Sequence, residues 1–139
     1  MNPQENVKIV QQAYENFQKG NIPALLESLS DNVEWVLPEI ENVPVGGKRQ
    51  GRDGVADFFA KLNETQEKID FAPTEFVAQG EKVVVLGRYI WRVRASQGQF
   101  TSDWAHVFTV RNGRIERFQE FTDTAAVVAA YKQQQTRAA

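Results

Sequence analysis

His106 is the single histidine among the 139 residues of this sequence, and it lies within an aromatic and aliphatic run, Trp104–Phe108. A histidine can donate or accept a proton near neutral pH, so a histidine that lies among aromatic neighbours could act as an acid–base catalyst. A lone histidine on an aromatic strand face could equally be a hydrogen-bonded core residue. Residue type and spacing leave both interpretations open.

Glu120 is the second residue that could do chemistry. A carboxylate that faces an apolar pocket is suited to taking a proton from a substrate. The alternatives are an ion pair with Arg88 or Arg92 across the sheet, or a position that faces water. The two arginines could also clamp a carboxylate or enolate oxygen, although arginines on strands are often solvated or structural.

Apolar and aromatic side chains could form the walls of a pocket. Tyr14 could offer its hydroxyl to a ligand carbonyl or only fill the core, and Trp35 and Trp104 could hold a flat ligand or pack without a function. The residues expected on this basis to contact a ligand are Tyr14, Trp35, Leu37, Phe58, Trp104 and Phe118.

Composition excludes several other classes of function. The net charge is −2 and the 16 basic residues are spread among 18 acidic ones, so nucleic acid and anionic membrane are not expected partners. The sequence has no cysteine and one histidine, and no phosphate-loop or nucleophile-elbow motif, so we expect neither a metal site nor a cofactor. No long apolar run or signal peptide is evident, which predicts a cytoplasmic protein.

Helices are expected before and after a set of strands. Apolar residues at three- and four-residue spacing predict a first helix that stops near Gly20. Asn21 as N-cap and Pro23 in the first turn predict a second, short helix. A third helix is predicted over residues 55–62, after a glycine-rich loop from Glu39 to Gly54. The stripe of the first helix consists of Val7, Val10, Tyr14 and Phe17.

The strands are expected to form a meander. Val33–Leu37 predicts a short strand, and four long antiparallel strands are predicted from Lys68 onward. A final short helix is predicted from Asp123 to Gln134, with a frayed end over residues 131–139. The order predicts one α+β domain over residues 1–139, in which a curved antiparallel sheet packs against three N-terminal helices and encloses a ligand pocket. The turn signals are Gln79-Gly80, Gln97-Gly98 and Asn112-Gly113.

Strand parity decides which side chains point inward. On the strand around residues 87–93, parity alone leaves two inner sets possible. On the next strand, the even-numbered set that contains Trp104 and His106 is the expected inner face, because it is the aromatic one. The two alternatives for the earlier strand are Arg88, Ile90 and Arg92, or Gly87, Tyr89, Trp91 and Val93.

The last strand carries apolar residues of both parities. Phe118 and Glu120 share a face, whereas Ile115 and Phe121 have the other parity. Either a bulge intervenes or both faces of the sheet are covered, and coverage of both faces would imply dimerisation. If both faces are covered, the aromatic residues expected on the outer face are Tyr89, Trp91 and Phe121.

Three strings of the sequence carry a family resemblance: AYENFQKGNIPALLESLSDNVEW, GRDGVADFF and HVFTVRNGRIERFQEFTD. They resemble the SnoaL-like branch of the nuclear transport factor 2-like superfamily, which includes ketosteroid isomerase and limonene epoxide hydrolase. The resemblance implies a cone-shaped, cystatin-like fold with a pocket at its open end, frequent dimers through the outer sheet face, and proton-transfer or hydration chemistry by pocket carboxylates.

The resemblance also assigns roles to residues. The carboxylate of the epoxide hydrolases falls on Glu120 and their arginine on Arg88, which implies that Arg88, Ile90 and Arg92 form the inward face of their strand. Ile90 and Arg92 then join the expected ligand contacts, and Arg88 is expected to stabilise negative charge on a substrate oxygen.

Departures from the family patterns narrow the activity. Ile90 stands at the position of the epoxide hydrolase aspartate, and Trp35 and Leu37 replace the residues that hold water. The catalytic aspartate of the ketosteroid isomerases is also replaced by Trp35. The SnoaL-type cyclases place an aspartate on the last strand, and Glu120 is its conservative counterpart.

The sequence therefore predicts a cofactor-independent acid–base enzyme of the isomerase, cyclase or hydratase type. Its substrate would be a small hydrophobic carbonyl compound, with Glu120 as proton-transfer residue and His106 and Arg88 assisting. The alternatives are a ligand-binding domain without turnover and a dimeric interaction domain.

Overall fold

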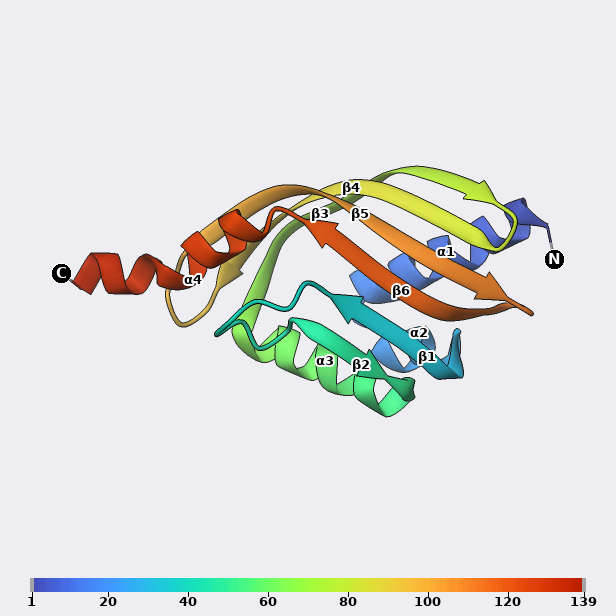
Figure 1. Ribbon diagram of the computed structural model, residues 1–139, viewed down its shortest axis with the longest axis horizontal. Helices are drawn as coiled ribbons and strands as arrows, with labels where there is room; N and C mark the ends of the chain where they lie inside the picture. The colour runs from blue at the N-terminus through green and yellow to red at the C-terminus, as the bar shows by residue number, and fades with distance from the viewer. Residues whose placement is uncertain (1, 139) are drawn as a thin grey trace.

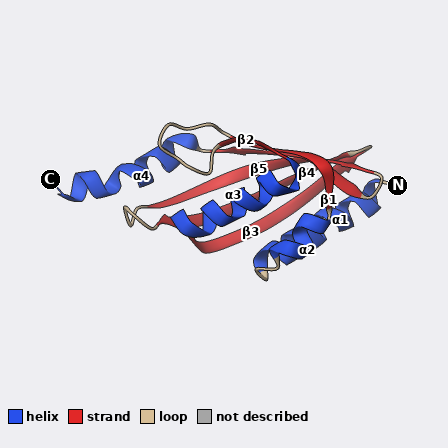
Figure 2. Ribbon diagram, turned by 90° about the horizontal axis from the view of Figure 1, so that it is seen from below, coloured by secondary structure: helices blue, strands red, loops and turns tan. Residues whose placement is uncertain are grey.

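Six strands form one curved sheet in the order β2-β1-β6-β5-β4-β3, and helices pack against one face of it (Figures 1 and 2). This computed structural model describes the backbone of residues 2–138 and the side chains of residues 2–132. The helices are α1 Pro3–Gln18, α2 Ile22–Glu27, α3 Gly51–Thr65 and α4 Thr124–Ala138. The strands are β1 Leu29–Leu37, β2 Gly47–Gln50, β3 Gln66–Gln79, β4 Lys82–Val93, β5 Gln99–Arg111 and β6 Arg114–Thr122. The predicted α+β class and the curved sheet are confirmed.

The helix starts follow from local chemistry. Asn2 accepts a hydrogen bond from the backbone N–H of Glu5 at the start of α1, and Asn21 accepts one from Ala24 at the start of α2. Asp123 caps α4 in the same way. Side chains from residue 133 onward lie outside the described part of the chain, so the single domain over residues 1–139 and its frayed end over 131–139 stay predictions.

Two features of the sheet differ from the prediction. The segment expected as a loop between Glu39 and Gly54 contains β2, which pairs antiparallel with β1, and α3 begins at Gly51. Over the described residues 2–138, the sheet therefore has six strands rather than five. In addition, β1 runs parallel to β6, with Trp35 opposite Phe118, so the sheet is not wholly antiparallel. The pairing with β6 places the rings of these two residues in contact.

The register between β4 and β5 corrects the inward face of β4. Tyr89 lies opposite Ser102, and Gly87 lies opposite Trp104. Residues directly opposite each other share a face of the sheet, and the even-numbered set of β5 faces the helices. The odd-numbered residues of β4 therefore point inward. The prediction that Arg88, Ile90 and Arg92 point inward, and Tyr89 and Trp91 outward, is wrong.

A bulge in the β5–β6 pairing explains the mixed parity of the last strand. Thr109 pairs with Arg117, whereas Val110 pairs with Ile115, so the register shifts by one residue between these pairs. Ile115 is thereby buried on the same face as Phe118, and Phe121 is left outside with 51% of its surface exposed. Among the described residues, no helix is both long and apolar enough to cross a bilayer.

Candidate functional site

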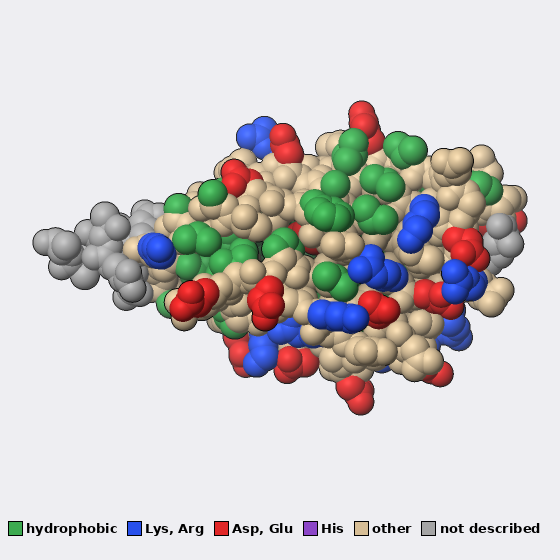
Figure 3. Space-filling model, viewed as in Figure 1, with side chains coloured by type: hydrophobic (Ala, Val, Ile, Leu, Met, Phe, Trp, Pro, Cys, Tyr) green, Lys and Arg blue, Asp and Glu red, His purple; other side chains and the backbone are tan. Residues whose placement is uncertain are grey.

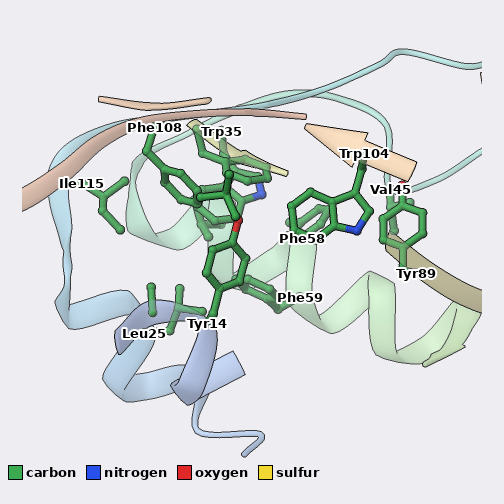
Figure 4. Packing of buried hydrophobic residues seen from close by; sticks show 14 of the residues in the cluster. Tyr14, Leu25, Trp35, Val45, Phe58, Phe59, Tyr89, Trp104, Phe108 and Ile115 are labelled. Atoms are coloured by element: carbon green, nitrogen blue, oxygen red, sulfur yellow. The ribbon is translucent and has the colours of Figure 1, made fainter. Parts of the chain in front are cut away.

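A cavity of about 110 Å³ lies between the sheet and the helices, and its wall is almost entirely apolar and aromatic. Figure 4 shows how buried hydrophobic side chains such as Tyr14, Trp35 and Phe58 pack together in this region. Of the predicted ligand contacts, five line it: Tyr14, Trp35, Leu37, Phe58 and Phe118. Trp104 lies just behind the wall, stacked on His106 with ring centroids 3.9 Å apart. His106 and Glu120 also line the cavity. The predicted pocket is therefore present, with a polar pair on one side.

A chain of hydrogen bonds runs through the wall of this cavity. The hydroxyl of Tyr14, on α1, lies 2.7 Å from Nδ1 of His106 on β5. The other ring nitrogen, Nε2, lies 2.9 Å from Oε2 of Glu120 on β6. His106 and Glu120 are directly opposite each other in the β5–β6 register, so the sheet itself brings them together. The side chain of Glu120 is 12% exposed and that of His106 is 5% exposed.

The direction of proton donation along this chain follows from burial. Burial lowers the pKa of His106, although the hydrogen bond to Glu120 and the charge of Glu120 oppose this shift, so the imidazole is neutral near neutral pH. Burial and the charge of Glu120 raise the pKa of Tyr14 well above its usual range, which keeps its hydroxyl protonated. Tyr14 therefore donates to Nδ1, and Nε2–H donates to Glu120. His106 holds one carboxylate oxygen in place.

A second polar string borders the same carboxylate. Tyr89 donates its hydroxyl to Oγ1 of Thr122 at 2.6 Å, and Thr122 in turn contacts Oγ of Ser102 at 3.0 Å. Burial, and then the charge of Glu120, raise the pKa of Tyr89, so this phenol also stays neutral. Tyr89 and Thr122 both line the cavity, and neither was predicted. Thr122 shares the parity of Glu120, which was a usable signal in the sequence.

The arginines predicted for the site lie elsewhere. The side chain of Arg88 is 66% exposed on the outer face and lies 4.0 Å from Asp103. Arg92 pairs with Glu67 at 3.0 Å, and Ile90 shares its outward parity. Both alternative ion pairs of Glu120 with arginine are therefore absent. Within the described part of the chain, no lysine or arginine lines the cavity.

The described residues contain no group of three or more His, Cys, Asp and Glu side chains that could hold a metal ion. The polar side chains of the wall are two phenols, an imidazole, a carboxylate, a threonine hydroxyl and the amide of Gln66, which donates to the hydroxyl of Tyr131. Such a set can bind an oxygen atom and move a proton. The expectations that no metal and no cofactor are used stay predictions.

The neutral imidazole of His106 should make stability depend on pH. We expect the free energy of unfolding to fall as the pH drops from about 7 to about 5, by up to about 1.4 kcal/mol per pH unit. The unfolded chain takes up a proton at His106 near pH 6.5, whereas the folded chain resists it, so the unfolded state binds more protons in this interval. Denaturant unfolding at several pH values measures this slope.

His106→Gln is the matched variant for that measurement, because glutamine can still donate a hydrogen bond to Glu120 but does not titrate. Its stability should depend less on pH over the same interval. Carboxylates elsewhere contribute equally to both proteins and cancel in the comparison. Parallel curves for the two proteins would show that His106 carries no such linkage.

Comparison with known proteins gives one family. Residues 10–118 match the family described as SnoaL-like domain. An NTF2-like protein from Burkholderia xenovorans LB400 is similar in structure at 34% identity, with a TM-score of 0.86 over 94% of this chain and 98% of that chain. Among curated proteins, none matches this chain.

Two further solved structures are similar. TerC co-crystallised with polyporic acid is 29% identical, with a TM-score of 0.83 over 92% of this chain and 98% of that one. A structure from Mesorhizobium loti described as a putative SnoaL-like polyketide cyclase is 15% identical, with a TM-score of 0.69 over 83% of this chain and 97% of that chain, and shares the fold.

Proposed function

This chain belongs to the SnoaL-like domain family, and we propose that it moves protons on a small hydrophobic carbonyl compound held in its cavity. Glu120 is the proton acceptor, and His106 and Tyr14 hold it in position. The reaction is of the isomerase, cyclase or hydratase type and uses no cofactor. The observation that carries this proposal is the hydrogen-bond chain Tyr14–His106–Glu120, which ends at a carboxylate in an otherwise apolar cavity.

The position of Glu120 supports its role as a base. Its carboxylate is nearly buried, so little water competes with a substrate for it. His106 donates to Oε2, so we assign the other oxygen, Oε1, to the substrate's proton. The neighbouring wall is too apolar to bind a charged substrate, so we infer a neutral one. The proton that Glu120 removes would come from a carbon next to a carbonyl group of that substrate.

The neutral state of His106 supports its role as a positioning residue. A neutral imidazole donates one hydrogen bond to Glu120 through Nε2–H, and the bond from Tyr14 to Nδ1 fixes the tautomer that does so. The same bonds orient the carboxylate, which lowers the entropic cost of reaching the reactive geometry.

The similar structure of TerC supports a small-molecule ligand, since that protein was co-crystallised with polyporic acid. The substrate itself need not be known to test the chemistry. We expect the protein to accelerate the exchange of the α-hydrogens of 1-indanone for deuterium in D₂O, followed by ¹H NMR. A ligand-binding domain without turnover would bind 1-indanone and leave its exchange rate at that of buffer.

We also propose that two copies of this chain associate through the outer face of the sheet. Two neighbouring rows of apolar side chains cross this face, each built from residues opposite each other in register. Phe121 is 51% exposed, Val77 58% and Leu86 38%. Figure 3 shows hydrophobic side chains gathered on this side of the molecule. The rows are Val77–Val84–Val107 and Leu86–Ala105–Phe121.

Phe121→Asp is expected to convert a dimer into a monomer, because it places a charge within these rows where the partner's apolar side chains would cover it. Light scattering at working concentration measures the mass. Ile69→Asp is the matched control, since Ile69 is 42% exposed on β3 but lies outside the two rows. A wild-type mass equal to that of one chain would contradict the proposal.

A further inference from the structure

Two buried indole nitrogens have no hydrogen-bond partner among the described residues: Nε1 of Trp35 and Nε1 of Trp104. Nearly all buried donors in folded proteins are paired, and an unpaired one is costly to bury. Each therefore calls for an explanation. Both lie in the aromatic cluster around the cavity, as Figure 4 shows.

The two tryptophans differ in where they lie. Trp35 is part of the cavity wall, whereas Trp104 lies behind it. The ring of Trp35 stacks on Phe118 at 4.1 Å, and Phe118 meets the edge of His106 at 4.7 Å. The indole of Trp35 is thus separated by one ring from the imidazole that holds Glu120. Trp35 and Glu120 line the same cavity.

Proton abstraction next to a carbonyl group places negative charge on the carbonyl oxygen, and that charge needs a donor. The arginine expected for this role, Arg88, lies on the outer face of the sheet. No lysine or arginine among the described residues lines the cavity. The hydroxyls of Tyr14 and Tyr89 are already engaged with His106 and Thr122. The amide of Gln66, also in the wall, already donates to Tyr131. Among the described side chains of the wall, the N–H of Trp35 is the buried donor that has no partner at all.

We propose that Nε1–H of Trp35 binds the carbonyl oxygen of the substrate and stabilises the enolate that forms when Glu120 removes the α-proton. This inference rests on the proposed function and names its substrate class, an enolisable ketone of one or two fused rings. In the step, the α C–H bond breaks and its proton goes to Glu120. The C–H electron pair forms the C=C bond, and the π pair of the carbonyl moves to oxygen. Return of the proton to carbon completes the reaction.

The size of the cavity limits the size of the substrate. Its volume of about 110 Å³ is below the roughly 150 Å³ that holds a benzene in an engineered cavity. A ring that enters must therefore displace wall side chains. The N–H of Trp35 gains from such entry, because it is already removed from water and has no bond to lose.

Indole resonances test the contact directly. The chain has three tryptophans, so a ¹⁵N-labelled protein gives three indole N–H signals, which Phe variants assign. We expect 1-indanone to move the Trp35 proton signal downfield, by at least several tenths of a ppm more than indane does. Indane has the same fused-ring skeleton and no carbonyl, so it corrects for ring-current effects. Equal shifts with the two probes would overturn the inference.

The exchange reaction tests the catalytic part. We expect Trp35→Phe to slow α-hydrogen exchange of 1-indanone by about tenfold to a hundredfold, as loss of one donor to an oxyanion does. β-Benzothienylalanine at position 35 replaces the N–H by sulfur and keeps the ring, so it separates the donor from packing. It should show the same loss.

The outcomes separate this inference from the proposed function. If Glu120→Gln abolishes exchange and the sulfur analogue at position 35 leaves it unchanged, the inference fails and the proposed function stands. If the Trp35 signal responds to the carbonyl and exchange is never accelerated, carbonyl recognition by Trp35 stands, whereas its enolate role fails together with the proposed function. If 1-indanone does not shift the Trp35 signal and its exchange is not accelerated, the inference and the proposed function both fail.

Discussion

Glu120→Gln is expected to slow the α-hydrogen exchange of 1-indanone by about a thousandfold relative to the unmodified protein. Glutamine has nearly the same shape and can still accept a hydrogen bond from Nε2 of His106, so the wall of the cavity should be retained. It cannot take up a proton at neutral pH, however, and so removes the base. The exchange rate is read from the loss of the α-hydrogen signal by ¹H NMR in D₂O.

Glu116→Gln is the matched control for that variant. Glu116 lies on the same strand, β6, but its carboxylate pairs with Arg111 at the surface and does not line the cavity. This change should leave the exchange rate unaltered. Binding of indane, followed through the tryptophan signals, should be unchanged in both variants. An equal rate for Glu120→Gln and wild type would remove Glu120 from the chemistry.

Gly87→Ala is expected to destabilise the fold by about 3 kcal/mol, one of the larger effects for a single methyl group. A Cβ at Gly87 would overlap the indole of Trp104, with Cε2 at 2.6 Å, so the ring has to move. Trp104 cannot shift freely, because it stacks on His106 at 3.9 Å. Overlap here therefore also disturbs the hydrogen bonds of His106. Denaturant unfolding measures the change in free energy.

Gly54→Ala provides the comparison for the same chemical change. Gly54 lies in α3, where a Cβ would meet Arg49 at 3.4 Å, and alanine favours helix over glycine. That variant should be as stable as wild type or more so. If Gly87→Ala unfolds at the same denaturant concentration as wild type, that result contradicts the close packing of Trp104 on Gly87.

Much of the fold could be predicted because its signals are local. Asn21 and Pro23 mark a helix start wherever they fall before an apolar stripe, since capping involves only the next few residues. The shared parity of Phe118 and Glu120 likewise needs only the two-residue repeat of a strand. β2 was missed because its four residues, Gly47–Gln50, pair with β1 and have no apolar alternation of their own.

The arginine assignment failed because parity within one strand does not say which face is inner. That is decided by the partner strand, through the pairs Gly87 with Trp104 and Tyr89 with Ser102. The even-numbered face of β5 was correctly expected inside. The last pair of the two strands, Arg92 with Gln99, encloses six residues, and an even number pairs even positions with odd ones, so the turn held the missing information.

The sequence by itself determined the fold class and the family. It also identified Glu120 and His106 as the residues that could do acid–base chemistry. These depend on residue type and short-range period, which the chain carries without folding. The tertiary structure decided that the two lie 2.9 Å apart, that Tyr14 completes the chain, and that Arg88 lies outside. It also left the N–H of Trp35, in the cavity wall, without a hydrogen-bond partner among the residues that the structure describes. Contacts between distant segments depend on strand register and helix placement, and single-strand periodicity contains neither.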